Sequence, residues 1–281
     1  MRTDLYHRFL ERSVVEKLII LNIVIFVLTY LINTISFLFH SDANLIVDWF
    51  SLKPSFEQLL FRPWTLVTYG FLHVGFFHIL FNLLILYYFG NLFLDFFDSG
   101  QFLVYFILGV VSGGLVYMIS YNYLPALKTQ ETILVGASAG DTAIVIGIAA
   151  HIPNYSLHFR FIGSVKLMYI AAIMVVLDLV QIPAGNAGGH LAHLGGALIG
   201  FLLTQYLDQG RGLSTWWENL WVTKKKSPLK TVYKNKEPGV PTKKHAFDQE
   251  KIDGILDKIS KSGYETLTKE EKDYLFKVGK N

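Results

Sequence analysis

Long runs of apolar residues, separated by short polar segments, dominate the first 208 residues of the chain. A helix needs about 20 apolar residues to cross the hydrocarbon core of a bilayer. The pattern predicts six membrane-spanning helices, at residues 18–38, 74–97, 101–121, 138–152, 166–182 and 190–208. The predicted fold class is therefore an all-α membrane protein built as a bundle of six transmembrane helices, with residues 18–208 as its main domain.

The fourth predicted span is shorter than the others. It runs for 15 residues from Ser138 to Ile152 and is followed by Pro153. At about 1.5 Å per residue it covers roughly 22 Å of a core that is roughly 30 Å thick. We therefore expect Ser138 to lie below the membrane surface. Residues 125–135 must then enter the membrane as non-helical backbone, which is tolerated only where it is buried in protein or lines a water-filled cavity.

The first long loop, roughly residues 40–71, is too apolar for a free loop. Its large apolar side chains are interrupted by Pro54 and Pro63. Short amphipathic helices that lie in the membrane interface have this composition. We expect such elements in the first loop.

The sequence changes character after the last predicted span. Residues 209–245 are rich in lysine and proline without periodicity and are predicted to form a basic linker. In residues 246–281, apolar residues recur at helical spacing from Ile252 to Ile259, and Thr268 with Glu271 forms a capping box before a second apolar group. These features predict a small helical hairpin in the cytosol, without a catalytic constellation.

The composition supports a membrane protein, with 52% hydrophobic and 17% charged residues. Most lysines follow Lys224, so the net charge of +3 reflects the C-terminal segment and does not indicate a nucleic-acid-binding surface. Basic residues precede the first span and follow the sixth, and the positive-inside rule then places both termini, including residues 1–17, in the cytoplasm. The absence of cysteine excludes disulfides and thiolate chemistry.

A serine and a histidine stand in two different predicted spans. Ser138 begins the fourth span and His193 lies in the sixth. Ionisable residues at membrane depth are costly and are therefore functional candidates. A serine needs a base to take its proton, and a positioned base is worth roughly 10²- to 10⁴-fold in rate. Small residues near His193, Gly196 and Gly200 among them, let helices approach closely in lipid, and we expect this packing to hold the imidazole within hydrogen-bond range of Ser138. The alternative is a packing motif with an incidental histidine and a helix-capping serine.

The second predicted span carries further hydrogen-bond donors. His78 and Asn82 are four residues apart and project from one helical face. With backbone donors at Gly136 and Ser138 they would form an oxyanion hole, in which one donor is typically worth about 3 kcal/mol. The alternative is that both side chains bond neighbouring helices, for about 0.6 kcal/mol each. His73, just before this span, is a possible modulator of the site.

Other polar residues surround the predicted pair. Asp141 is a candidate third catalytic member that orients His193, or a polar site with a structural role, or a cause of impaired activity. His190 is a possible modulator that faces water or gates the cavity. Asp178, in the fifth span, is expected to bond an adjacent helix. Neither His190 nor Asp178 is predicted to be catalytic.

Three motifs stand in order on the second, fourth and sixth predicted spans: His73-x4-His78-x3-Asn82, Gly136-x-Ser138 and Ala192-His193-Leu194-Gly195-Gly196. Together they resemble the rhomboid intramembrane serine proteases, in their six-span bacterial form, over roughly residues 17–208. The resemblance implies a catalytic dyad of Ser138 and His193 without a required aspartate. It also implies an oxyanion hole from His78, Asn82 and the Ser138 amide, and a multi-pass location in the inner (plasma) membrane.

Two positions depart from that family. Some members carry a tyrosine at the position of Thr142 that stacks on the catalytic histidine. Since Thr142 cannot stack, we expect helix packing alone to hold His193. The family arginine beside the loop tryptophan, Trp64 here, corresponds to Thr65, so the anchoring of the first loop is expected to differ.

The leading prediction is an intramembrane serine endopeptidase that cleaves transmembrane segments in lipid through an acyl-enzyme. It needs no metal or cofactor, and no nucleic acid is an expected partner. A zinc protease would require His-Glu-x-x-His, which the chain lacks. A second hypothesis is a catalytically impaired rhomboid-like protein that binds membrane clients. A third is a cofactor or transport protein in which His78 and His193 ligate haem or line a proton path.

Overall fold

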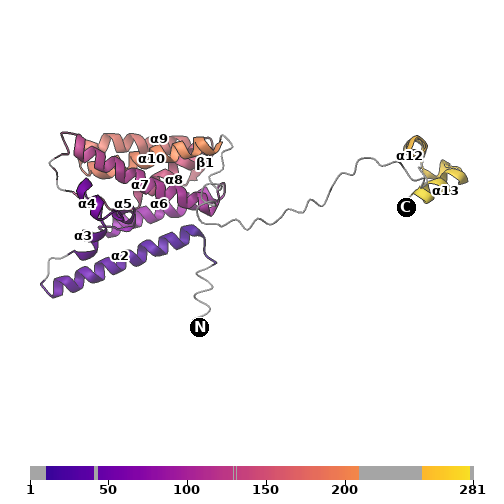
Figure 1. The fold of residues 1–281 in the computed structure, drawn as a ribbon. Helices are drawn as coiled ribbons and strands as arrows, with labels where there is room; N and C mark the ends of the chain where they lie inside the picture. Colours follow the sequence, from indigo (N-terminus) through magenta and orange to yellow (C-terminus); the bar gives the residue numbers. More distant parts are fainter. Residues whose placement is uncertain (1–10, 41–43, 129, 131, 209–248, 279–281) are drawn as a thin grey trace, which may run out of the picture. The chain divides into compact units, whose positions relative to one another are not determined.

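The computed structural model describes residues 11–40, 44–128, 130, 132–208 and 249–278. The chain divides into two compact units, residues 1–224 and 225–281. Five helices of the first unit are long and apolar enough to cross a membrane (Figure 1): α2 (Val14–Leu38), α6 (Phe76–Leu94), α7 (Ser99–Tyr123), α9 (Leu167–Gln181, continued by the 3-10 turn η2, Ile182–Ala184) and α10 (Ala187–Asp208). Capping boxes start two of them, at Ser13 for α2 and at Asp98 for α7.

Helix α8 (Ser138–His151) corresponds to the fourth predicted span and begins at the predicted residue. It has only 14 residues, so it falls short of the length required of the other five, and the predicted count of six spans is not established. Every residue from Ala139 to Ala149 is buried, with α7 and α10 as the main neighbours. The short helix is thus the centre of the bundle, shielded by protein on its sides.

Small residues allow α10 to lie directly against α8. A Cβ atom at Gly196 would overlap the backbone carbonyl of Ala139, and one at Gly200 would overlap that of Ala143. The close helix approach predicted around His193 is confirmed at these two glycines. Because His193 precedes Gly196 by three residues, this contact carries the imidazole to the first turn of α8.

The first loop folds into short helical elements, as predicted: α3 (Leu45–Phe50), α4 (Phe56–Phe61), α5 (Thr65–Thr68) and the 3-10 turn η1 (Tyr69–Phe71). Arg62, at the end of α4, joins α4 to α3, since its guanidinium lies 4.2 Å from the ring centre of Trp49 and donates to the Asp48 carbonyl at 2.7 Å. The Trp64 indole donates to the Trp49 carbonyl at 3.0 Å. Arg62 therefore supplies anchoring that Thr65 cannot. The position of this loop in a membrane interface stays a prediction.

The chain before α8 runs as non-helical backbone through the protein. Leu134 is buried and pairs with Leu52 of the first loop through two backbone hydrogen bonds, of 2.8 and 3.2 Å. Residues 133–135 line a cavity. The expectation that residues 125–135 are buried or line a cavity is therefore confirmed for residues 133–135, whereas Pro125, Ala126, Lys128 and Gln130 are exposed.

A small β-hairpin joins α8 to α9, between the fourth and fifth predicted spans, and adds one non-helical element to the predicted all-α bundle. Strands β1 (Ser156–Phe159) and β2 (Gly163–Lys166) pair antiparallel, with Leu157 opposite Val165. The turn uses Gly163 at a positive φ of 77°, which favours glycine. Strands of four residues carry too little alternation for the sequence pattern to reveal them.

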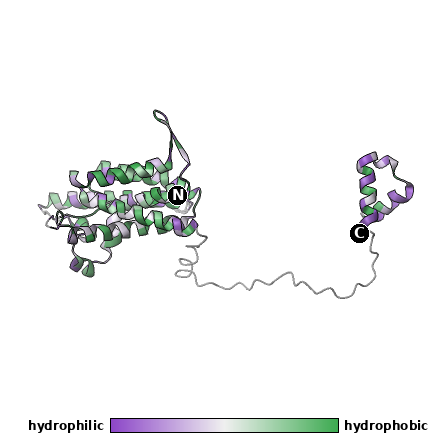
Figure 2. Ribbon diagram, turned by 90° about the horizontal axis from the view of Figure 1, so that it is seen from above, coloured by the Kyte–Doolittle hydropathy of each residue, from purple (hydrophilic) through white to green (hydrophobic). Residues whose placement is uncertain are grey.

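The described residues of the second unit, 249–278, form a pair of helices, α12 (Gln249–Ser262) and α13 (Lys269–Val278), joined through the 3-10 turn η3 (Tyr264–Thr266). The predicted capping box is present, because the Thr268 amide donates to the Glu271 carboxylate at 2.8 Å and the Glu271 amide donates to Thr268 Oγ1 at 3.3 Å. Figure 2 shows this unit as largely hydrophilic, unlike the mostly hydrophobic helices of the first unit. The structure shows two helices in this region, while the boundaries of the hairpin and its place in the cytosol stay predictions.

Two predicted segments fall wholly or partly outside the described residues. They are the basic linker at 209–245, which lies beyond the last described residue of α10, and the N-terminal part of residues 1–17, of which 1–10 are not described. The domain boundaries predicted at residues 18, 208 and 245 therefore stay predictions.

Candidate active site

A tight turn at Gly136 leads into α8, which begins at Ser138. Ser138 is the first residue of the helix, so its backbone N–H has no acceptor within the helix. Gly136, two residues before, has φ of +122°, and a Cβ atom there would lie 2.7 Å from His78 Nε2. The turn therefore requires glycine twice over, for its backbone conformation and for the close approach of the His78 ring.

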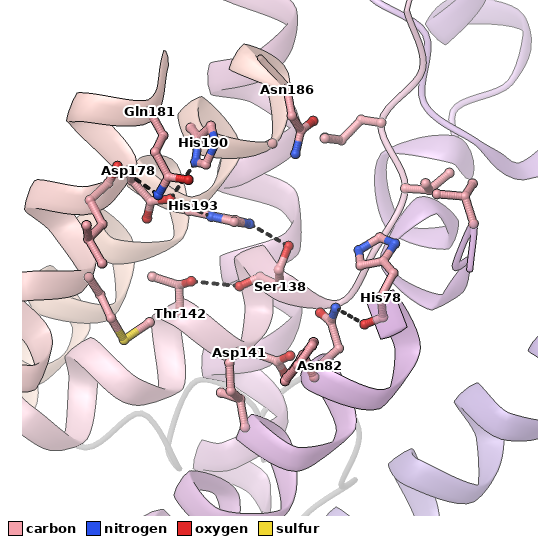
Figure 3. A pocket seen from close by; sticks show the side chains of 18 of the residues that line it. His78, Asn82, Ser138, Asp141, Thr142, Asp178, Gln181, Asn186, His190 and His193 are labelled. Carbon is pink, nitrogen blue, oxygen red and sulfur yellow. Dashed lines mark hydrogen bonds and ion pairs between the residues drawn. The ribbon is translucent and has the colours of Figure 1, made fainter. Parts of the chain in front are cut away.

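His193 of α10 reaches Ser138 directly. Its Nε2 lies 2.7 Å from Ser138 Oγ, and the rings and side chains converge as Figure 3 shows. Its other ring nitrogen, Nδ1, lies 2.8 Å from Asp178 Oδ1 on α9. The expectation that helix packing alone holds His193 is therefore wrong, because Asp178 also fixes the ring.

Asp178 contacts two histidines of α10. The same Oδ1 atom also lies 2.9 Å from His190 Nδ1. The prediction that Asp178 bonds an adjacent helix is confirmed. The link from Asp178 to His193 was missed, yet the sequence held a signal for it. Asp178 lies seven residues before Gly185 and His193 eight after it, and antiparallel helices joined by a short turn bring such positions to one level.

Asp141 and Thr142 lie on the first turns of α8, and the hydrogen bonds of His193 go to Ser138 and Asp178 instead. Thr142 Oγ1 donates to the Ser138 carbonyl at 2.8 Å. Asp141 is buried, and neither carboxylate oxygen has a hydrogen-bond partner among the described residues. The hypothesis that Asp141 orients His193 is not supported, because Asp178 occupies the position at Nδ1.

The predicted oxyanion donors lie on the opposite side of Ser138. Asn82 Nδ2 donates to the His78 carbonyl at 2.7 Å, which leaves the second N–H of the amide for another acceptor. The Gly136 N–H donates to the Tyr69 carbonyl at 2.9 Å. Gly136 is therefore already committed as a donor in this conformation, and its structural contribution is the turn that admits His78.

His73 lies behind His78, with 5.1 Å between the ring centres. Burial, and then the nearby His78, lower the pKa of His73 to about 4. His73 is therefore neutral near pH 7 and adds no charge behind the His78 ring.

The site opens into a cavity of about 570 Å³. Its walls come from α6, α8, α9, α10 and residues 133–135, and they include Ser138, His193, Asp178, His190, His78, Asn82, Asp141 and Thr142. The structure thus brings together most of the predicted site residues, while His73 lies outside the cavity wall.

The cluster of Asp178, His190 and His193 also has the spacing of a metal site. Their candidate ligand atoms all lie within 4.8 Å of one another. Hydrogen bonds among these same atoms already account for the arrangement. No metal was predicted from the sequence, and we assign none.

The helices and their hydropathy define a multi-pass membrane protein, and its cavity holds a partly buried serine–histidine pair. The rhomboid domain family matches residues 61–209. The chain therefore belongs to the rhomboid family. Residues 242–280 match a separate family of unknown function (DUF6576).

Two relatives show how far the family resemblance extends. RHOMBOID-like protein 12, mitochondrial, of Arabidopsis thaliana is 27% identical over 213 residues, covering 72% of this chain and 60% of that protein. Inactive rhomboid-related protein 2 of Caenorhabditis elegans is 28% identical over 170 residues, covering 57% of this chain and 45% of that protein. The chain thus spans about half the length of these relatives. Since one relative is named inactive, family membership alone does not establish activity.

Proposed function

We propose that this protein is an intramembrane serine endopeptidase. The observation that carries the proposal is the 2.7 Å contact between Ser138 Oγ and His193 Nε2 inside a cavity of about 570 Å³. A nucleophile in hydrogen-bond reach of its base is the arrangement that acyl transfer requires. The cavity supplies space for the substrate carbonyl and for water.

The chemistry uses these two side chains in turn. Ser138 Oγ bonds to the substrate carbonyl carbon while His193 Nε2 takes the hydroxyl proton. The peptide C–N bond then breaks, and His193 gives the proton to the departing amine, leaving an ester on Ser138. Water, deprotonated by His193, hydrolyses that ester and restores the serine.

The developing oxyanion is stabilised by donors around the start of α8. The Ser138 N–H points from a helix N-terminus, where the helix dipole favours negative charge. His78 and the second N–H of Asn82 complete the donor set, in agreement with the oxyanion hole predicted from the sequence. Gly136 is left out of this set because Tyr69 already accepts its N–H.

The substrates that fit this site are transmembrane segments. The cavity is lined by α6 and α9, and α9 exposes most of its apolar surface, including Ile173, Val176 and Val180. A substrate helix in lipid therefore reaches the cavity along these two helices. The proposal places α8 as a sixth, shortened span in the inner (plasma) membrane, with both termini in the cytoplasm.

Labelling with a fluorophosphonate probe tests the proposal, combined with cleavage of a model single-span substrate by the full chain. Wild type is expected to label and to cleave, whereas Ser138→Ala and His193→Ala do neither. Equal thermal stability of the three proteins shows that the variants are folded. Wild type that neither labels nor cleaves would overturn the proposal.

The second candidate is a catalytically impaired protein that binds membrane clients, favoured by the relative that is named inactive. It predicts capture of a single-span client without cleavage, and equal capture by wild type and Ser138→Ala. The protease predicts that Ser138→Ala retains a client which wild type cleaves.

A further inference from the structure

We propose that Asp178 is a positioning residue which sets the tautomer of His193, and that His190 holds Asp178 in place for this task. The inference rests on the proposed function and deepens it. The dyad expected from the sequence becomes a Ser138–His193–Asp178 triad with a fourth supporting side chain.

The tautomer follows from the donors and acceptors around the His193 ring. An ionised carboxylate can only accept hydrogen bonds. The 2.8 Å contact between Asp178 Oδ1 and His193 Nδ1 therefore requires the proton on Nδ1. In a neutral imidazole this leaves a lone pair on Nε2, which lies 2.7 Å from Ser138 Oγ. The opposite tautomer would present an N–H to Ser138 and could not take its proton.

His190 restrains the carboxylate from a second direction. It lies one turn before His193 on α10, and its Nδ1 shares the same oxygen at 2.9 Å. The side chains of Asp178 and His190 are only 11% and 13% exposed. Side chains this sheltered from water depend on their protein partners for hydrogen bonding. The carboxylate therefore has one preferred orientation, in which Oδ1 faces both histidines.

The carboxylate matters most when His193 becomes positively charged. In the transition state the ring takes the Ser138 proton, and a negative charge 2.8 Å away stabilises the imidazolium. Ground-state binding of the substrate does not create this charge. The contribution of Asp178 is therefore expected in kcat and in the labelling rate, with little change in KM.

The test compares Asp178→Asn and Asp178→Glu with a matched control, Asp208→Asn. Asp208 Oδ1 lies 3.0 Å from His151 Nδ1, so the control weakens another aspartate–histidine contact between α8 and α10, but at residues outside the cavity wall. Three quantities are measured on the full chain in detergent. They are the fluorophosphonate labelling rate, kcat and KM on a single-span substrate, and the 15N NMR signals of His193, assigned by their loss in His193→Ala.

We expect Asp178→Asn to lower kcat and the labelling rate by about 10²-fold or more, with KM within about threefold of wild type. The Nδ1–H signal of His193 is expected in wild type and lost in Asp178→Asn. Asp178→Glu keeps the carboxylate and is expected to recover part of the rate. Asp208→Asn is expected to behave as wild type.

The outcomes separate this inference from the proposed function. If wild type is active and Asp178→Asn labels at the wild-type rate, the positioning role is overturned and the protease stands. If wild type is inactive, the protease fails, and the NMR signal still decides whether Asp178 sets the tautomer. If Asp178→Asn does not fold, the 15N NMR spectrum of wild type still decides the matter. A signal that places the proton of His193 on Nε2, and not on Nδ1, overturns the inference.

Discussion

Two buried aspartates line the same cavity and differ in their surroundings. Asp178 on α9 accepts from two histidines, at 2.8 and 2.9 Å, whereas Asp141 on α8 has no hydrogen-bond partner among the described residues. Their exposures are similarly low, 8% and 2%. Burial alone therefore does not distinguish a carboxyl that positions a neighbouring residue from one that does not. Only hydrogen-bond partners compensate the cost of removing a carboxylate from water. In this site the aspartate with partners is Asp178 on α9, which lies on a different helix from Ser138.

The largest expected loss of activity comes from moving His193 and Asp178 away from Ser138. Gly196→Leu places a side chain where the Ala139 backbone lies, so α10 must move away from α8 and take His193 with it. We expect labelling of Ser138 to fall by at least about 10³-fold, near the loss of the base itself.

A matched leucine measures the cost of the substitution itself. Gly254→Leu lies in α12, where a Cβ atom meets nothing within 4 Å, and it is expected to label as wild type. Retained labelling in Gly196→Leu would show that the close helix contact does not position His193.

The same substitution, aspartate to asparagine, at Asp178 and at Asp141 tests the difference between the two residues most directly. Asp178→Asn is expected to slow labelling by about 10²-fold or more, because the His193 tautomer is no longer enforced. The Asp141 carboxylate has no hydrogen-bond partner among the described residues, so Asp141→Asn is expected to cost far less. Parallel labelling time courses decide the matter, and equal losses would mean that both carboxyls act on the serine in the same way.

His190 sharpens the comparison on the Asp178 side. His190→Gln removes the imidazole that shares Asp178 Oδ1 but leaves the contact to His193. We expect a loss of about tenfold or less in kcat, smaller than for Asp178→Asn, since one of two restraints remains. Measurement of kcat for His190→Gln, for Asp178→Asn and for the double variant tests this order of effects. An equal loss in His190→Gln and Asp178→Asn would assign the main role to His190.

Stability should respond in opposite directions at the two aspartates. Asp141→Leu removes an unpartnered buried carboxyl and is expected to stabilise the protein by about 1–3 kcal/mol. Asp178→Leu leaves two histidines without their acceptor and is expected to destabilise it. Thermal unfolding of the full chain in detergent measures both. Destabilisation by Asp141→Leu would indicate a partner for Asp141 that the described residues do not supply.

The smallest effect concerns a partnered carboxylate on the surface. The Thr268 backbone amide, followed by Lys258, lowers the pKa of Glu271 below its usual value of 4.5. A lowered folded-state pKa means that this stabilisation is present above about pH 4.5 and is lost as the pH falls through the folded-state pKa. The α12–α13 amide signals in NMR spectra of the full chain should therefore weaken on acidification. Glu271→Gln should reduce that pH dependence, and an unchanged profile would contradict the role of Glu271.

Most of the architecture could be predicted from the sequence, because membrane helices are recognisable by their length and hydropathy. The start of α8 at Ser138, the short helices of the first loop and the Thr268–Glu271 cap were all readable from local pattern. The β1–β2 hairpin was not, since four-residue strands leave almost no periodic signal.

The site was harder to predict where it depends on contacts across helices. Asp141 attracted attention because it is three residues from Ser138 in the chain. Three residues along a helix leave two side chains only about 60° apart around the axis, so the chain spacing placed Asp141 near the face of Ser138. Figure 3 shows Asp141 toward Asn82, away from His193, a difference that depends on the neighbouring helices. Asp178 is 40 residues from Ser138, and only the antiparallel packing of α9 on α10 brings it to the imidazole.

The central claim is that the Ser138–His193 pair is catalytic, and covalent labelling of Ser138 by a fluorophosphonate tests it most directly. Mass spectrometry of the labelled full chain locates the adduct. The account predicts an adduct on Ser138 in wild type, none in Ser138→Ala, and a strongly slowed reaction in His193→Ala. A folded wild-type protein without an adduct on Ser138, or one labelled equally fast in His193→Ala, would contradict it.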